Sequence, residues 1–257
     1  MKRVKVLILQ APGTNCDRET GFCFRYLGAE AEFLLIKKLL KRPQELHFYH
    51  ILCLPGGFTY GDDISAGRVL ANQLRFLLWK ELNKFYRDGK LILGICNGFQ
   101  VLVKSGILPF WSGQNATLTL NDCGHFIDEW VHLKVNKDNS SLWLKNLPEV
   151  FYLPIAHAEG KFLIPKSNFP RIRGLVALQY CSPEGKADFS HNPNGSLFNI
   201  AGITEPEGRI LGLMPHPERH SFLYQNPYWT SLDGGPEREG LLILKNGVDY
   251  ARSVLLS

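Results

Sequence analysis

The chain has 257 residues, 45% of them hydrophobic and 21% charged, and without linkers or repeats this favours one α/β domain, expected to span residues 1–257. The net charge of +5 is scattered, so it gives no case for a nucleic-acid partner, and no apolar run approaches the ~20 residues of a membrane span. Six widely spaced cysteines without a CxxC pair argue against a disulfide frame or a zinc site and favour a cytoplasmic protein with reduced thiols.

The first half of the chain alternates between short apolar runs and amphipathic stretches. Strands are predicted over 4–9, 31–36, 51–54 and 91–95, and helices over 16–27, 43–48, 64–85 and 97–104. Asn15 is placed to cap the first helix, and Gly28 is placed to end it. This alternation predicts a parallel sheet with helices on both faces.

From about residue 117 the pattern changes to strands with few helices between them. Strands are predicted over 129–135, 151–155, 175–181, 196–204 and 210–214, and a last helix from about 236 past 250. The run from Asn192 to Gly195 is a strong hairpin signal. We therefore predict an α/β fold, a single domain with a mixed, mostly parallel central sheet flanked by helices.

Cys96 follows the buried strand over 91–95 and precedes a predicted helix. Gly94 and Gly98 are small enough to permit a tight strand-to-helix turn, the layout of a nucleophile elbow. Such a turn exposes the sulfur at the carboxyl edge of the sheet, beside a helix N-terminus that favours the thiolate. On this motif alone, a buried core cysteine is about as good an interpretation.

His216 and Glu218 follow another buried strand, in a loop stiffened by prolines. Residues two apart in such a segment project to the same side, so Glu218 is placed to orient the imidazole of a general base. A lone His-x-Glu is more often a surface pair. The catalytic interpretation is favoured here because both elements end at the carboxyl edge of one parallel sheet, where ligands bind.

Gly56 and Gly57 follow the strand over 51–54 and form a third element at this edge. Consecutive glycines let the backbone turn its N–H groups toward a substrate, and we pair the N–H of Gly57 with that of Asn97 as an oxyanion hole. Taken alone, the glycines are better explained by turn geometry.

These motifs resemble those of the class I glutamine amidotransferases, and nearly the whole chain resembles their PurQ family, the glutaminase subunits of phosphoribosylformylglycinamidine synthase. Six segments match in the family's order: APGTNCD at 11–17, LPGGFTYGD at 54–62, LGICNGFQ at 93–100, IAHAEG at 155–160, NPNGS at 192–196 and MPHPER at 214–219. Ala158 stands where the family usually has glycine, while 182–191 and 221–235 match less clearly.

The resemblance implies a flavodoxin-like fold and a glutaminase in which Cys96 is the nucleophile, His216 the base and Glu218 its orienting carboxylate. Gln100, one helical turn after the nucleophile, is expected to contact glutamine, with an exposed helix residue as the alternative. His157 and Glu159 are better explained as a pocket wall or a partner contact than as a second catalytic pair.

The resemblance also implies partners. Ammonia would pass to a large ATP-dependent subunit, PurL, helped by a small subunit, PurS, to make formylglycinamidine ribonucleotide in purine biosynthesis. ATP and magnesium are expected there, because this chain has no G-x-x-x-x-G-K-[ST] loop; no cofactor and no metal are expected in the chain itself.

Three alternatives stay open. A glutaminase subunit of another synthetase would differ in the acceptor enzyme that it activates. A cysteine hydrolase of the same fold usually has a histidine soon after the elbow, and 97–105 contains none. A non-catalytic binding subunit would have lost Cys96, His216 or Glu218, and all three are present.

Overall fold

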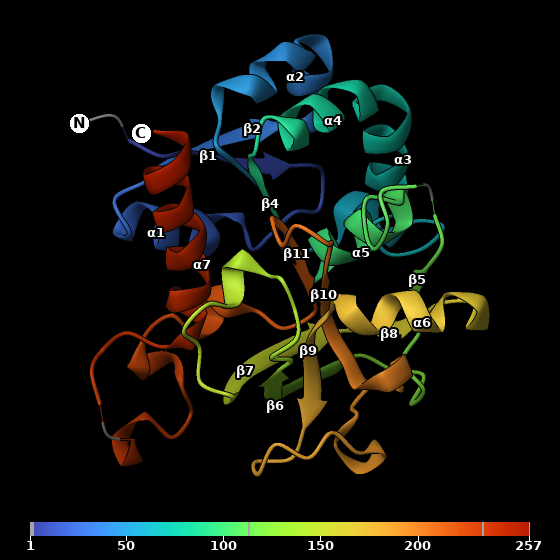
Figure 1. Cartoon of the computed structure of the whole chain (residues 1–257), viewed down its shortest axis with the longest axis vertical. Helices are drawn as coiled ribbons and strands as arrows, with labels where there is room; N and C mark the ends of the chain where they lie inside the picture. The colour runs from blue at the N-terminus through green and yellow to red at the C-terminus, as the bar shows by residue number, and fades with distance from the viewer. Residues whose placement is uncertain (1–2, 113, 233, 257) are drawn as a thin grey trace.

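A nine-stranded sheet crosses the computed structural model in the order β2-β1-β3-β4-β11-β10-β9-β6-β7 (Figure 1). The structure describes residues 3–112, 114–232 and 234–256. The sheet strands are β1 (Lys5–Gln10), β2 (Glu30–Leu35), β3 (Ile51–Leu54), β4 (Leu91–Ile95), β6 (Ile127–Val135), β7 (Val150–His157), β9 (Val176–Cys181), β10 (Ile200–Thr204) and β11 (Ile210–Leu213). A separate antiparallel pair is formed by β5 (Thr117–Thr119) and β8 (Lys161–Leu163).

The sheet is mixed, as predicted, and most of its strands run in one direction. The five strands β2, β1, β3, β4 and β11 are parallel to one another. Each later step, from β11 to β10, β9, β6 and β7, is antiparallel. Two antiparallel steps restore the direction, so β9 and β7 again run with β11. The carboxyl ends of β3, β4, β11 and β7 therefore point toward the same edge.

Helices cover both faces of the parallel strands, as predicted. Figure 1 shows α1 and α7 on one side of these strands and α3 and α5 on the other. The helices are α1 (Asp17–Tyr26), α2 (Ile36–Lys41), α3 (Arg68–Leu77), α4 (Trp79–Arg87), α5 (Asn97–Ser105), α6 (Phe169–Ile172) and α7 (Glu239–Tyr250). Every residue of β3, β4, β10 and β11 is buried, and this explains why their sequences are continuous apolar runs.

The predicted cap of the first helix is wrong. Cys16, not Asn15, stands at the N-cap of α1, and no side chain caps it. The backbone N–H groups of Asn15 and Cys16 both donate to the Gly56 carbonyl, so this segment is held by the glycine loop instead. Gly28 ends the helix as predicted, with a φ of +79° that favours glycine.

Three other predictions differ from the structure. The helix predicted over 64–85 is two helices, because Leu78 leaves helical geometry (ψ 0°) and α4 then packs on the turn Pro43–Phe48. Asn192 does not open a tight hairpin: its side chain makes a local turn, accepting from the Gly195 and Ser196 N–H groups, inside the long connection between β9 and β10. The strand predicted over 196–204 begins only at Ile200, after a 3₁₀ turn.

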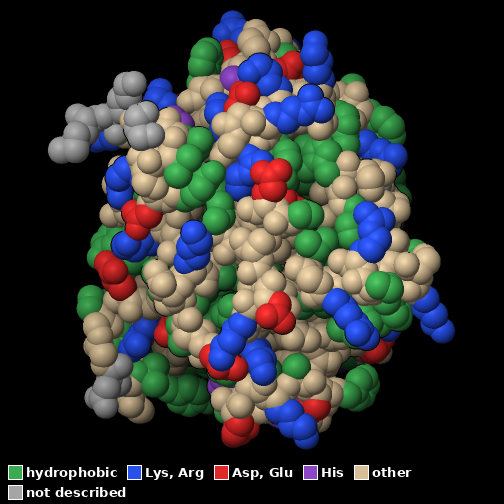
Figure 2. Space-filling view, viewed as in Figure 1, with side chains coloured by type: hydrophobic (Ala, Val, Ile, Leu, Met, Phe, Trp, Pro, Cys, Tyr) green, Lys and Arg blue, Asp and Glu red, His purple; other side chains and the backbone are tan. Residues whose placement is uncertain are grey.

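The described surface carries charges of both signs. Figure 2 shows Lys and Arg side chains dispersed over one face, with Asp and Glu among them. No helix in the described part of the chain is long and apolar enough to cross a membrane.

Candidate active site

Cys96 lies in a strained turn between β4 and α5. Its backbone adopts φ 50° and ψ −105°, which a non-glycine residue rarely does. The turn needs small neighbours: a Cβ at Gly98 would lie 1.9 Å from the Leu54 carbonyl oxygen, and one at Gly94 would lie 2.5 Å from Leu102. The predicted elbow is therefore present, at the carboxyl edge of the sheet.

His216 and Glu218 form a buried pair just after β11. His216 Nδ1 lies 2.6 Å from Glu218 Oε1, and the two residues are only 2% and 1% exposed. Burial opposes the charged imidazole, but the negative charges of Glu218 and Cys96 raise the pKa of His216 well above its ordinary value. Its Nε2 is buried and has no partner in the described part of the protein, so this atom remains available to a reacting group.

The sheet brings this pair to the elbow. Strands β4 and β11 are adjacent and parallel, with Ile95 beside Leu213, so the segments that follow them leave the same edge together. The electrostatic effect of Cys96 on His216 reflects this proximity. The three residues predicted from separate motifs therefore lie in one site, and their catalytic roles remain predictions.

The glycine loop after β3 lines both cavities at Cys96 through Gly57. Gly57 pairs with Thr14 in an isolated bridge, but that bridge uses the N–H groups of Phe58 and Asn15, not the Gly57 N–H. Asn97 begins α5, where backbone N–H groups lack an intrahelical acceptor. Both predicted oxyanion donors thus belong to the segments that meet at Cys96.

A cavity of about 200 Å³ opens beside Cys96, lined by Gly57, Phe58, Asp62, Cys96, Gln100, Leu120 and residues 156–159. Gln100 is 3% exposed, so its interpretation as an exposed helix residue is wrong. Its amide donates from Nε2 to the Glu159 carbonyl (2.7 Å) and accepts from Asn97 Nδ2 (2.9 Å). The side chain is therefore fixed in the wall of this cavity.

Cys16 is an active-site residue that the sequence motifs alone did not single out. With Cys96 and His216 it lines a second cavity of about 150 Å³, and its sulfur accepts a hydrogen bond from Arg219 (3.2 Å). Ligand atoms of Cys16, His216 and Glu218 lie within 4.8 Å of one another, close enough to hold an ion such as Zn²⁺, although no metal was predicted. Cys16 is far from His216 and Glu218 in the sequence, so no ligand spacing predicted this group of three.

His157 and Glu159 do not pair with each other. His157 Nδ1 contacts Asn121 (3.1 Å), and burial lowers the pKa of this imidazole to about 4, so it is neutral near pH 7. The Glu159 carboxylate instead bonds Lys104 (2.9 Å) and the Ala66 N–H (3.1 Å). Both residues line the cavity beside Cys96, in agreement with the predicted pocket wall.

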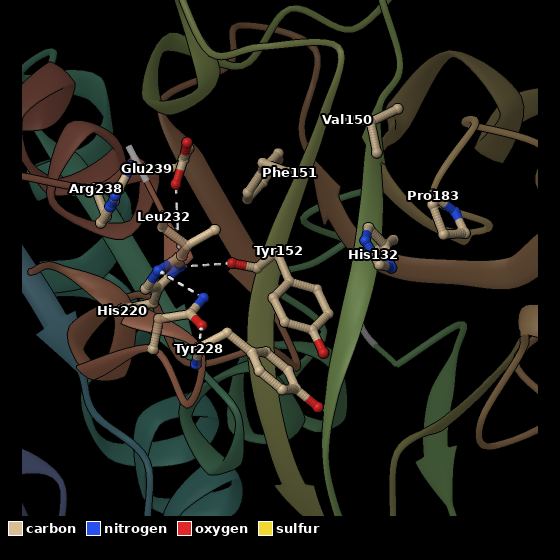
Figure 3. A pocket seen from close by; sticks show the side chains of 11 residues that line it. His132, Val150, Phe151, Tyr152, Pro183, His220, Tyr228, Leu232, Arg238 and Glu239 are labelled. Carbon is tan, nitrogen blue, oxygen red and sulfur yellow. Dashed lines mark hydrogen bonds and ion pairs between the residues drawn. The ribbon is translucent and has the colours of Figure 1, made fainter. Parts of the chain in front are cut away.

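A larger cavity, about 480 Å³, is separate from Cys96 and lies between β6, β7 and the segment before α7. Figure 3 shows the rings of Tyr152 and Tyr228 side by side, with His220 between Tyr152 and Glu239. His220 Nδ1 donates to the Tyr152 carbonyl (2.7 Å), and this holds the turn Pro217–His220 against β7. None of the triad residues lines this cavity.

Residues 3–251 match the family of the CobB/CobQ-like glutamine amidotransferase domain. Phosphoribosylformylglycinamidine synthase subunit PurQ of Dehalococcoides mccartyi is 45% identical, over 99% of this chain and 100% of that protein. The subunit of the same name from Pyrococcus furiosus is 37% identical, over 97% of this chain and 100% of that protein.

Solved structures agree with these relatives. A chain from the structure of PurLQS from Thermotoga maritima superposes with a TM-score of 0.73 and 29% identity, over 97% of this chain and 99% of that one. A glutamine amidotransferase from Thermotoga maritima shares the fold alone, with a TM-score of 0.53 and 16% identity over 98% of this chain and 94% of that one.

Proposed function

The chain belongs to the CobB/CobQ-like glutamine amidotransferase family, and within it to the PurQ family, and we propose that it hydrolyses glutamine through Cys96, His216 and Glu218. As a family member it is a glutamine amidotransferase, the glutaminase subunit of phosphoribosylformylglycinamidine synthase. The observation that carries the proposed triad is the buried 2.6 Å pair of His216 and Glu218, placed beside the strained Cys96 elbow.

In the first half of the reaction, the Cys96 thiolate attacks the carboxamide carbon of glutamine. A charged His216 beside the sulfur stabilises the thiolate, and the raised pKa of this imidazole supports that state. The developing oxyanion accepts hydrogen bonds from the N–H groups of Gly57 and Asn97. The imidazolium of His216 then gives its proton to the leaving nitrogen, so ammonia departs and a glutamyl thioester remains.

In the second half, His216 is neutral and takes a proton from water as that water attacks the thioester. The oxyanion again accepts hydrogen bonds from the same two N–H groups. Collapse of this tetrahedral intermediate releases glutamate and regenerates the Cys96 thiolate and the charged imidazole. Glu218 keeps Nδ1 protonated and directed toward itself, so that Nε2 handles the protons in both halves. Gln100 contacts the bound glutamine from the wall of the cavity beside Cys96.

The ammonia then passes to an ATP-dependent synthetase subunit of PurL type, with a PurS-type subunit in the same complex. The similarity to a chain of the PurLQS structure supports this assignment. ATP and magnesium act at the synthetase subunit, and the chemistry proposed for this chain uses only its own side chains and backbone.

Glutamate release from glutamine tests the proposal. It is measured for the full chain alone and with PurL- and PurS-type partners, as wild type, Cys96→Ser and Cys123→Ser. We expect release that rises with the partners, disappears in Cys96→Ser and persists in Cys123→Ser, because Cys123 is exposed and outside the site. A silent wild-type complex, or an active Cys96→Ser, would overturn the nucleophile assignment. Activation by the synthetase of another pathway instead would reassign the partner.

A further inference from the structure

Lys104 is a buried, charged side chain on α5, the helix that directly follows Cys96. It is 1% exposed, although lysine is almost never fully buried unless it is paired. Gln100 precedes it by one helical turn, so both side chains leave the same face of α5. The Lys104 ammonium donates to Ser65 Oγ (3.3 Å), the Ala66 carbonyl (2.6 Å) and Glu159 Oε2 (2.9 Å).

Glu159 connects this ammonium to the cavity wall. Its two carboxylate oxygens accept from different groups, Oε2 from Lys104 and Oε1 from the Ala66 N–H (3.1 Å). Its backbone carbonyl accepts from Gln100 Nε2 (2.7 Å). One residue therefore joins the ion pair to the amide that is expected to contact glutamine.

The other end of the Gln100 amide is fixed as well. The Asn97 Oδ1 atom accepts from the Thr59 N–H (3.3 Å) and hydroxyl (2.7 Å), so the Asn97 Nδ2 atom must be the group that donates to Gln100 Oε1 and to Asp62 Oδ1 (3.1 Å). Because a carbonyl accepts at one end and an amide donates at the other, Gln100 has a single orientation. The network ties α5, the segment 59–66 and the end of β7 together around the cavity.

From this geometry we propose that Lys104 and Glu159 are positioning residues for glutamine binding, a role that rests on the proposed glutaminase function. The pair acts through the Glu159 backbone, which holds the Gln100 amide and the 156–159 wall in place. A buried ion pair is weak evidence for stability alone, because an apolar side chain of similar volume often replaces it without loss. Burial lowers the pKa of Lys104, and the bond to Glu159 opposes that change, so the carboxylate helps to keep the ammonium charged.

Lys104→Met and Glu159→Gln test the proposal from both sides. Methionine keeps most of the length of the side chain without its charge. In glutamine one of the two carboxylate oxygens is replaced by an NH₂ donor, so with the side chain in the same place either the Ala66 N–H or the Lys104 ammonium would face a donor instead of an acceptor. Lys84→Met is the matched control, because Lys84 makes an ion pair of the same 2.9 Å length with Asp88, but on the surface.

Glutamine hydrolysis by the full chain with its synthetase partner gives kcat and KM. Iodoacetamide labelling of Cys96, followed by mass spectrometry, measures the reactivity of the thiol independently of the contacts to glutamine. Both variants are expected to raise KM about tenfold, equivalent to about 1.4 kcal/mol. Their kcat and labelling rate should stay within about twofold of the wild-type values, and Lys84→Met should change neither KM nor kcat. An unchanged KM in a folded variant, or a fall in labelling that parallels the fall in hydrolysis, would overturn the positioning role.

The double variant Lys104→Met/Glu159→Gln covers the case in which Lys104→Met alone does not fold, since it removes both charges together. A double variant that melts near the wild-type temperature and keeps the raised KM supports positioning. Recovery of KM together with stability would mean that the pair is only structural. A wild-type complex without glutaminase activity would instead count against the proposed function itself.

Discussion

Glu218→Gln is expected to lower kcat for glutamine hydrolysis by about 10- to 160-fold and to leave KM unchanged. Glu218 is 1% exposed and lies 2.6 Å from His216 Nδ1, so the substitution keeps the shape of a buried residue and removes its charge. A hydrogen bond to a charged group contributes about 1.5–3 kcal/mol, and each ~1.4 kcal/mol changes a rate tenfold. KM is expected to stay constant because Glu218 lines neither cavity at Cys96.

The pH dependence supplies a second readout with a defined sign. The wild-type carboxylate contributes to the raised pKa of His216, so the imidazole stays protonated to higher pH. Without that charge it loses its proton at lower pH, and the alkaline limb of the kcat profile should move to lower pH. Steady-state glutamate release across the pH range measures both effects, with the exposed Glu149→Gln as control. A kcat within twofold of wild type, or an unmoved alkaline limb, would refute the orienting role.

Three other positions give separate expectations. Gly98→Ala should abolish hydrolysis, because its Cβ would lie 1.9 Å from the Leu54 carbonyl oxygen, whereas Gly174→Ala, with open space around it, should be active. Alkylation at neutral pH should spare Cys16, whose pKa is raised by burial, and peptide mapping that finds it labelled as fast as the nucleophile would contradict this. Burial lowers the pKa of His157 to about 4, so the unfolded chain binds the extra proton below about pH 6.5. The free energy of unfolding should therefore fall by about 3 kcal/mol between pH 6.5 and 4. Urea denaturation across this pH range measures it, and His157→Gln should remove this pH dependence. An unchanged pH dependence in the variant would exclude His157 as its source.

The parallel half of the fold is readable in the sequence because its strands are buried on both faces. A short continuous apolar run such as Leu91–Ile95 is typical of a strand covered by helices on both sides, and glycines such as Gly28 mark the helix ends. The sequence does not reveal where tertiary contacts override local preference. Asn15 is a good cap by type, yet its backbone is held by the Gly56 carbonyl, and the Asn192 turn packs inside a long connection.

The candidate site, like the fold, could be predicted only in part from the sequence. Cys96, His216 and Glu218 were predictable because each follows a recognisable strand end, and parallel strands share an edge. Cys16 and Lys104 were not, because a cysteine near a helix start is usually a core residue and a lysine within a helix is usually solvated. Their importance comes from neighbours distant in the sequence, Arg219 at Cys16 and Glu159 at Lys104, which only the fold brings together.

Strand β7 lies at one end of the sheet, yet it contributes to the candidate site, which lies at the central strands β4 and β11. The edge of a sheet exposes unpaired carbonyl groups that need partners. On β7, three alternate carbonyls receive hydrogen bonds from the segments that carry the proposed triad: Tyr152 from His220 Nδ1, Pro154 from the His216 N–H and Ala156 from the Cys96 thiol in its protonated form. Alternate residues of a strand direct their carbonyls to the same side, so one edge contacts the elbow and the histidine turn together. The sheet must therefore curl back on itself, and the turn that follows β11 both covers the open edge of β7 and is aligned by it.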